Sequence, residues 1–373
     1  MGSPVTMAIA DFKQKLDQGR IEFLLDLRLE NEFEEWRIEG VKPVETLNIP
    51  QVDFVGEEEK YFPRLPKDRE IFVVCAHGDA SRYVAEQLRE NGFRAASLEG
   101  GMDGWSDFYE THTVNASPEI IQIYRVAKGC ITHVVISDGK AVVIDCVRHI
   151  DRIKELVAAR GAELVGVFDT HLQADHVSGG RFLAEESGAD YYINEIDAAG
   201  AAYDFLPLQD ATQLDFGDCS LRAFHSPGHT PGSVSLLLND KFLFSGDTIM
   251  KSSVGRPDLG GMAKEWSHLL YDTLFVRFKP LSDEIIILPT HTFSINELTS
   301  TGIVKLTLGE ARSQLELYNI RDEDRFAARI KSLLLDNPPR YQDIRQVNLG
   351  LLAADETKMK ELEIGHNLCG MAK

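Results

Sequence analysis

The sequence predicts two domains in series, a small α/β domain with a parallel sheet and a larger domain built mostly from strands, followed by a helical C-terminal extension. Strand and helix patterns alternate up to residue 105, which is typical of a parallel sheet. From residue 120 onward, strand patterns follow one another directly. The chain has 373 residues, 43% of them apolar, which suits two domains with ordinary buried cores.

The first domain is expected over residues 1–106. Apolar positions at helical spacing predict a helix over 7–20, and an apolar run predicts a strand over 23–27. The remaining expected elements are an acidic helix (30–37), a short buried strand (71–74), a helix (82–91), a strand (93–98) and a turn into a helix (100–105).

Residues 107–118 are polar and without periodicity, so we expect a linker there. The second domain is expected over 119–300, with Asp138-Gly139 as a hairpin turn. The final segment, 301–373, is expected to be a helical extension packed on that domain. Expected strands are 120–126, 130–137, 140–144, 164–168, 191–194, 220–225, 233–239, 241–245 and 284–288, and expected helices are 151–160, 181–187, 265–273 and most of 309–335.

Composition limits the classes of partner. Lys and Arg number 39 against 59 Asp and Glu, a formal net charge of −20 that repels phosphate backbones and anionic lipid. We therefore expect neither nucleic acid nor membrane as a partner. The 5 cysteines are widely spaced and form no CxxC, and no signal-peptide pattern opens the chain. These features predict a cytoplasmic protein without a disulfide framework.

Cys75 is the first candidate for chemistry. It follows the buried strand 71–74 and precedes a helix, with Gly78 in the loop between them. Inward-turned loop amides and the helix N-terminus would favour a thiolate, which is the nucleophilic form. A lone cysteine is otherwise more often a buried structural residue, but this local context favours a reactive site.

Residues 7–105 resemble a rhodanese domain. The match includes Leu25-Asp-Leu-Arg28, Asn48-Ile-Pro50, the loop CAHGDAS after the strand, and Gly100-Gly-Met-Asp-Gly-Trp105. The resemblance implies that Cys75 carries a sulfane sulfur as a persulfide. The implied persulfide loop comprises Ala76, His77, Gly78, Asp79, Ala80, Ser81 and Arg82. Because its cations are limited to Arg82 and His77, both thiosulfate and a thiol persulfide remain open as sulfur donors.

A second group of polar residues is typical of a metal site. A single histidine on a strand is more often structural, but here several metal-type residues each follow an apolar run and lie beside Gly, Pro or Thr. They are His171, Asp175, His176, His229, Asp247 and His291.

Residues 119–300 resemble the metallo-β-lactamase superfamily, which implies an αββα sandwich. The pattern T-H-x-H-x-D-H appears as Thr170-His-Leu-Gln-Ala-Asp-His176, so Gln173 stands where the second histidine is expected. Two-metal hydrolases of this fold use both histidines of that pair, and glutamine offers only a neutral amide oxygen. The set His171, His229 and Asp247 is instead the two-histidine, one-carboxylate triad that suits Fe(II) and O2.

The sequence most closely resembles the persulfide dioxygenase branch of that superfamily. The resemblance implies one Fe(II) per chain, held by His171, His229 and Asp247, with Zn as the alternative metal. Further implied site residues are Gln173, Asp175, His176 and His291, as groups around the ligands or as a vacant second metal site, and Arg256 in Gly255-Arg-Pro-Asp258 as a substrate-binding residue. The tail 367–370 also resembles the ending of this branch and makes Cys369 a candidate thiol.

We therefore expect an iron-dependent persulfide dioxygenase with a sulfurtransferase domain that uses Cys75. The expected small molecules are a low-molecular-weight thiol persulfide such as that of glutathione, sulfite or thiosulfate, and O2. Members of the superfamily often form dimers, so a homo-oligomer remains one of the expected assemblies. Two alternatives stand: a two-metal thioester hydrolase of the glyoxalase II type, or a sulfur carrier with a degenerate metal site.

Overall fold

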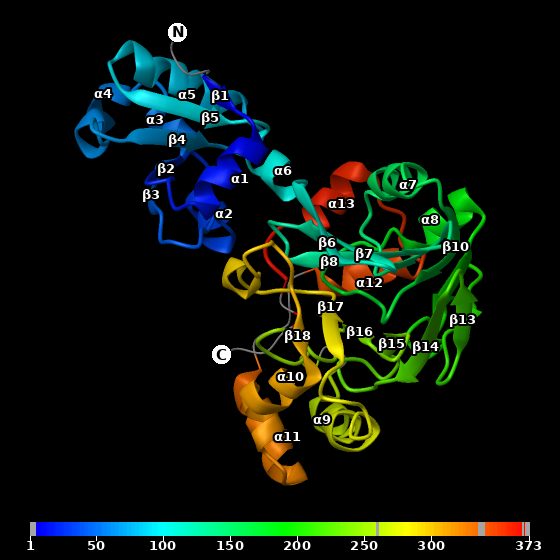
Figure 1. Cartoon of the computed structure of the whole chain (residues 1–373). Helices are drawn as coiled ribbons and strands as arrows, with labels where there is room; N and C mark the ends of the chain where they lie inside the picture. The colour runs from blue at the N-terminus through cyan, green and yellow to red at the C-terminus, as the bar shows by residue number, and fades with distance from the viewer. Residues whose placement is uncertain (1–4, 259–260, 335–339, 368, 370–373) are drawn as a thin grey trace. The chain divides into compact units, whose positions relative to one another are not determined.

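The structure, a computed structural model, describes residues 5–258, 261–334, 340–367 and 369 (Figure 1). It divides into two compact units, one formed mainly by residues up to Glu110 and the other mainly by Thr111 to Glu363. Within the described ranges, no helix combines the length and apolar composition that crossing a membrane requires.

The first unit is an α/β domain around a five-stranded parallel sheet of order β1-β5-β4-β2-β3. Alternate residues of its central strands enter two separate cores, Leu25 and Val73 on one face, Leu24 and Phe72 on the other. Its elements are β1 (Thr6–Met7), α1 (Ile9–Asp17), β2 (Phe23–Asp26), α2 (Glu30–Glu35), β3 (Glu45–Asn48), α3 (Gln51–Phe54), α4 (Glu58–Tyr61), a 3-10 turn (Phe62–Arg64), β4 (Glu70–Val74), α5 (Asp79–Glu90), β5 (Arg94–Leu98) and α6 (Gly101–Ser106).

The predicted alternation of strands and helices is confirmed, with two corrections. Strand β3 was not predicted because its polar residues lie at the sheet edge and are at most half-buried. Helix α5 begins at Asp79 rather than at residue 82, so the second half of the persulfide loop forms its first turn.

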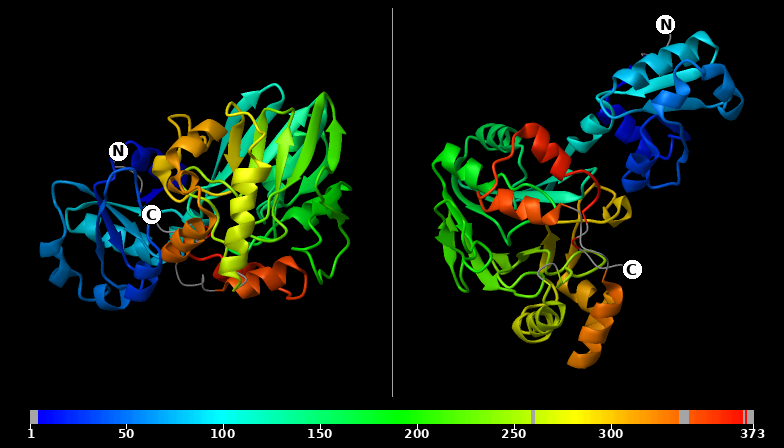
Figure 2. Two further views of the ribbon diagram at one scale, coloured as in Figure 1. Left: turned by 90° about the horizontal axis from the view of Figure 1, so that it is seen from below. Right: turned by 180° about the vertical axis from the view of Figure 1, so that it is seen from behind.

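The second unit is a sandwich of two sheets, of order β12-β11-β10-β9-β8-β7-β6 and β13-β14-β15-β16-β17-β18 (Figure 1; Figure 2). Ile144 and Phe168 of the first sheet share one core with Leu236 of the second. Leu237, one residue on, points to the other face and packs with the helices that cover it. This arrangement confirms the αββα sandwich.

The strands of this unit supply most of its core, and its helices lie outside the two sheets. The first sheet and its helices are β6 (Tyr109–Ala116), β7 (Glu119–Arg125), β8 (Cys130–Ser137), β9 (Lys140–Ile144), α7 (Ile150–Ala158), β10 (Glu163–Phe168), α8 (Gly180–Ser187), β11 (Asp190–Ile193) and β12 (Leu206–Pro207). The second sheet and its helices are β13 (Gln213–Phe216), β14 (Cys219–His225), β15 (Val234–Leu238), β16 (Phe242–Gly246), α9 (Ala263–Asp272), a π-turn (Thr273–Arg277), β17 (Ile286–Pro289), a 3-10 turn (Ile295–Glu297), β18 (Leu306–Thr307), α10 (Leu308–Gln314), a 3-10 turn (Glu316–Asn319), α11 (Glu323–Leu333), α12 (Tyr341–Asn348) and α13 (Glu356–Leu362).

Two tight turns connect strands of the sandwich. Asp138 and Gly139 both have positive φ, 44° and 70°, and confirm the predicted hairpin turn. The turn near Asp240 is formed by Asn239 and Asp240, which have φ of 50° and 51°.

The expected linker at 107–118 is wrong over most of its length, because Tyr109–Ala116 form β6. This strand closes one edge of its sheet, and its side chains are mostly exposed or half-buried. An edge strand needs few apolar residues, so its sequence carries a weak signal.

The C-terminal extension takes part in the sandwich itself. Strand β18 pairs with β17 in the second sheet, and Leu308 and Phe326 enter the same core as Leu270 of α9. The helix expected over 309–335 is two helices, since α10 ends at Gln314 and α11 begins at Glu323. Residue 335 lies outside the described part of the chain.

Candidate active sites

Cys75 follows β4 and is 5% exposed. The backbone amides of Gly78 and Ser81 donate to its Sγ at 3.1 and 3.3 Å. The Ser81 hydroxyl lies 3.3 Å from the same sulfur and 2.8 Å from the hydroxyl of Ser97. The loop therefore forms the amide cradle predicted around a reactive sulfur.

Two glycines make this loop possible. Gly78 has φ of 97°, a conformation that L side chains rarely adopt. A Cβ at Gly101 would lie 2.3 Å from the carbonyl oxygen of Cys75. That carbonyl instead accepts a hydrogen bond from the amide of Met102 at 2.9 Å, so the start of α6 holds the loop in place.

The basic side chains of the persulfide loop face carboxylates. Arg82 lies 3.6 Å from Asp79, and His77 Nδ1 lies 2.7 Å from Asp103 of α6. Both ion pairs are largely exposed. Ala76, His77, Asp79 and Ala80 line a pocket in front of the sulfur.

The second candidate site brings together three buried side chains from three strand ends. His171 follows β10, His229 follows β14, and Asp247 follows β16. Asp247 Oδ2 lies 3.7 Å from His171 Nε2 and 3.5 Å from His229 Nε2. Ligand atoms of all three lie within 4.8 Å of one another, and His171 Nε2 and Asp247 Oδ2 are buried without a hydrogen-bond partner.

Hydrogen bonds orient the two imidazoles. His229 Nδ1 donates to the backbone carbonyl of Arg256 at 2.9 Å. Nδ1 of His171 lies 3.0 Å from the hydroxyl of Thr170, which itself donates to Asp145. Burial lowers the pKa of His171 to about 3, so its imidazole is neutral. Both rings therefore present Nε2 lone pairs, as metal coordination requires.

His291 fixes the carboxylate. Its Nδ1 donates to Asp247 Oδ1 at 2.6 Å, and its Nε2 lies 3.1 Å from Asp175 Oδ2. Burial alone would lower the pKa of His291, but the two carboxylates outweigh burial and raise it well above its ordinary value. Burial alone would raise the pKa of Asp247, but His291, with His171 and His229, holds it below its usual range.

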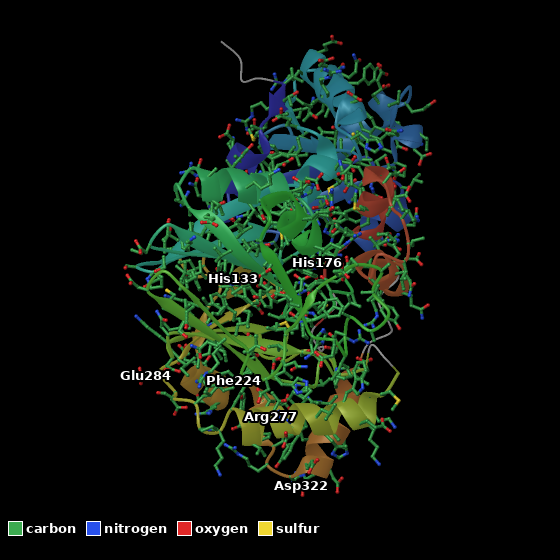
Figure 3. All side chains as sticks on the ribbon, turned by 90° about the vertical axis from the view of Figure 1, so that its right-hand side faces the viewer. His133, His176, Phe224, Arg277, Glu284 and Asp322 are labelled. Atoms are coloured by element: carbon green, nitrogen blue, oxygen red, sulfur yellow. The ribbon has the colours of Figure 1, made fainter. Side chains whose placement is uncertain are left out.

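A second buried group lies next to this one. It contains Asp175, His176 (labelled in Figure 3) and His291, and Cys130 joins it from the start of β8. His176 Nδ1 lies 3.0 Å from Asp175, and Cys130 Sγ lies 3.8 Å from the same carboxylate. Cys130 is buried at the start of β8 beside this group, whereas Cys146 and Cys219 are buried outside it.

Comparisons with known proteins identify the families that the two units resemble. Two family models match, the rhodanese-like domain over residues 8–108 and the metallo-beta-lactamase superfamily over 128–291. Persulfide dioxygenase ETHE1, mitochondrial, from Bos taurus is 30% identical over 189 residues, 49% of this chain and 72% of the bovine protein. The chain belongs to the persulfide dioxygenase family.

Two further proteins are similar to this chain. The human protein of the same name is 32% identical over 158 residues, 41% of this chain and 59% of that protein. A crystal structure of a metallo-beta-lactamase from Staphylococcus aureus subsp. aureus COL is 25% identical with a TM-score of 0.58, covering 63% of this chain and 73% of that chain.

Gln173 occupies a fixed position in this persulfide dioxygenase fold. Its Nε2 donates to Asp145 Oδ1 at 3.2 Å, and its Oε1 is buried without a hydrogen-bond partner. Asp145 also accepts from the amide and hydroxyl of Thr170 and from the hydroxyl of Thr290. Burial and the charge of Asp169 raise the pKa of Asp145 to about 7.

Arg256 and Cys369 also lie beside the candidate ligands. The guanidinium of Arg256 is 1% exposed and forms two hydrogen bonds of 2.7 Å with Asp258. Its backbone amide donates to the carbonyl of Cys369, whose thiol groups with Asp247 and His291. Substrate binding by Arg256 stays a prediction. The contact that the structure shows is the hydrogen bond from His229 to the backbone carbonyl of Arg256.

Sequence reasoning missed three residues that hold the loop 173–178. Asn348, the last residue of α12, donates to the carbonyls of Gln173 and His176 and accepts from the amide of Ser178, each at 2.9 Å. Glu363 accepts from the amide of Val177 at 2.8 Å. Asp145 follows an apolar strand and shared the signal of the predicted residues, whereas Asn348 and Glu363 have no local pattern.

Asn348→Ala is expected to lower the stability of the second unit and its affinity for metal. Three buried backbone groups would lose partners, at about 1–3 kcal/mol each before any water replaces the side chain. Metal affinity is expected to fall about tenfold as the loop loosens. Urea unfolding and calorimetric metal titration check this, with the exposed Asn319→Ala as control. Equal behaviour of the two variants would show that the loop does not depend on Asn348.

Proposed function

We propose that this chain oxidises a low-molecular-weight thiol persulfide with O2 at a single Fe(II), and that Cys75 transfers sulfane sulfur. The observation that carries the first part is the buried group of His171, His229 and Asp247, two of whose ligand atoms have no hydrogen-bond partner. Two imidazoles and one carboxylate are the donor set that suits non-haem Fe(II). Membership of the persulfide dioxygenase family supports the substrate class.

The proposed reaction converts R–SSH, O2 and H2O to R–SH, sulfite and two protons, with glutathione as the expected thiol. When bound, Fe(II) would supply open coordination positions and the electrons that O2 activation requires. The chain orients the donors: the Arg256 carbonyl holds His229, Thr170 holds His171, and His291 holds Asp247. All three donors are buried, with exposures of 1%, 1% and 2% for His171, His229 and Asp247.

Gln173 argues against a two-metal hydrolase. Its amide nitrogen bonds Asp145, and its neutral carbonyl oxygen is a weak ligand in the position where such enzymes use a histidine. In the adjacent group, His176 Nδ1 and His291 Nε2 lie 3.0 and 3.1 Å from the carboxylate of Asp175. We therefore propose that Asp175, His176 and His291 orient the metal ligands.

For the first unit, the amide cradle around Cys75 supports a sulfurtransferase role. Donated hydrogen bonds would stabilise the thiolate and the persulfide anion that forms on it. The rhodanese-like match over residues 8–108 covers this whole site.

Protein purified without added metal is expected to contain one iron per chain and to consume O2 with glutathione persulfide. Elemental analysis and an oxygen electrode provide the two measurements. Two zinc ions with thioester turnover would establish the hydrolase instead. If an iron-loaded sample did not take up O2, the remaining interpretation would be a sulfur carrier with a degenerate metal site.

Gln173→Ala is expected to retain iron, because Gln173 is not among the proposed ligands. It should cost about 1–3 kcal/mol of stability, since Asp145 loses a buried donor. Iron content is compared with that of His171→Ala, which should lose the metal. Loss of iron from both variants would make Gln173 a ligand.

Cys75→Ser is expected to abolish sulfur transfer and to leave O2 consumption with added persulfide largely intact. The two activities use different residues, so each can be followed alone. Cys219→Ser, a buried cysteine outside both sites, controls for general loss of a thiol. If O2 consumption fell together with sulfur transfer, Cys75 would be an obligatory relay to the oxidising site.

A further inference from the structure

The pocket in front of Cys75 combines apolar and acidic walls. It is a surface depression of about 520 Å³. Leu29 and Val52 line it and are 50% and 72% exposed, so both offer apolar surface to a bound molecule. Glu32 and Asp79 also line it, so the pocket that contains Cys75 carries two carboxylates.

Positive charge in this pocket is already neutralised. Among the described residues that line it, Arg28 is the one arginine or lysine. Arg28 is 6% exposed and donates to Asp26 Oδ2 and to the carbonyl of Trp36, both at 2.7 Å. The charge of this guanidinium is therefore already balanced by Asp26 within the unit.

The two cations of the persulfide loop are committed as well. Arg82 faces Asp79 at 3.6 Å, and His77 faces Asp103 at 2.7 Å. The four carboxylates of Asp26, Glu32, Asp79 and Asp103 outnumber the three basic side chains, Arg28, His77 and Arg82. These side-chain charges are unfavourable for a second anion that approaches Cys75, whose own thiolate is stabilised by the loop amides.

Sulfur donors differ in where they carry charge. In thiosulfate, the negative sulfonate is bonded directly to the sulfur that is transferred, so its charge must enter the pocket. An alkyl persulfide is attacked by a thiolate in its protonated form, R–S–SH, in which both sulfur atoms are uncharged, and the carboxylates of a carrier such as glutathione can stay in water. The exposed side chains of Leu29 and Val52 suit the alkyl part.

We propose that Cys75 exchanges sulfane sulfur with alkyl persulfides and thiols and discriminates against thiosulfate and sulfite. The proposal rests on the sulfurtransferase function proposed above. The Cys75 thiolate attacks the outer sulfur of R–S–SH; a Cys75–S bond forms, the R–S–S bond breaks, and R–SH leaves with the proton. The reverse step returns the sulfur to a thiol, and neither direction involves net oxidation.

This selectivity fixes the place of Cys75 in the reaction sequence. Forward and reverse transfer share one transition state, so a pocket that rejects thiosulfate as a donor also rejects sulfite as an acceptor. Cys75 therefore exchanges sulfur with persulfides before they are oxidised, and does not act on the sulfite that the oxidation produces. The reaction that supplies it is one that forms persulfides, and the sulfite made at the metal site leaves unconverted.

The test measures loading of Cys75 in the full chain without O2, so that persulfide is not oxidised. Glutathione persulfide or thiosulfate is added at equal concentration, and the mass of one added sulfur atom on Cys75 is followed by rapid quenching and mass spectrometry. We expect thiosulfate to load at least about tenfold more slowly. Transfer from preloaded Cys75 to glutathione should exceed transfer to sulfite by a similar factor.

A pair of charge variants makes the cause testable. The double variant Glu32→Gln, Asp79→Asn removes two charges from the pocket and is expected to raise the thiosulfate-to-persulfide rate ratio about tenfold. Glu86→Gln, an exposed acid on the same helix as Asp79 that does not line the pocket, should leave the ratio unchanged. Thermal unfolding verifies that each variant is folded.

The outcomes separate the two proposals. Equal or faster loading by thiosulfate, or an unchanged ratio in the double variant, would overturn the selectivity while leaving Cys75 as a sulfur carrier. If neither donor loads Cys75 in folded protein, and the Cys75→Ser variant behaves identically, the sulfurtransferase function itself is wrong.

Discussion

The second unit depends on one electrostatic constraint, which is that His171, His229 and Asp247 present lone pairs to one another in a buried position. An unsatisfied buried polar atom costs about 1–3 kcal/mol, and more when it is charged. The sandwich tolerates this because each of the three side chains is anchored through its other polar atom. Hydrogen bonds to Thr170, Arg256 and His291 keep the lone pairs directed inward.

The residues that anchor the site come from parts of the chain that are far apart in the sequence. Strand ends deliver the ligands, but the loop that carries His176 is held by Asn348 and Glu363 of the C-terminal extension. Glu363 is in turn fixed by Arg148 at 2.7 Å. The extension is thus needed for the site as much as for the core, which explains why it supplies β18 and α11 to the sandwich.

The sequence could predict the site where local pattern and chemistry coincide. An apolar strand that ends in Gly, Pro or Thr beside a metal-type residue identified His171, His229 and Asp247, and the strand–loop–helix pattern identified Cys75. It could not predict residues that act through long-range contacts, such as Asn348, because nothing near them in the chain distinguishes them. Strand β6 was missed for a related reason, since an edge strand needs little apolar surface.

The two sites differ in the kind of equilibrium that they can support. Exchange of sulfane sulfur at Cys75 makes one S–S bond for each one it breaks, so it runs with little driving force in either direction. Oxidation by O2 at the proposed metal site is strongly favourable and removes persulfide. Glu32 and Asp79 in the Cys75 pocket would repel sulfite, the product of the oxidation. Sulfite would then not accept sulfur from Cys75 to form thiosulfate. Consumption of persulfide would then pull the exchange toward the metal, without any requirement that the two sites touch.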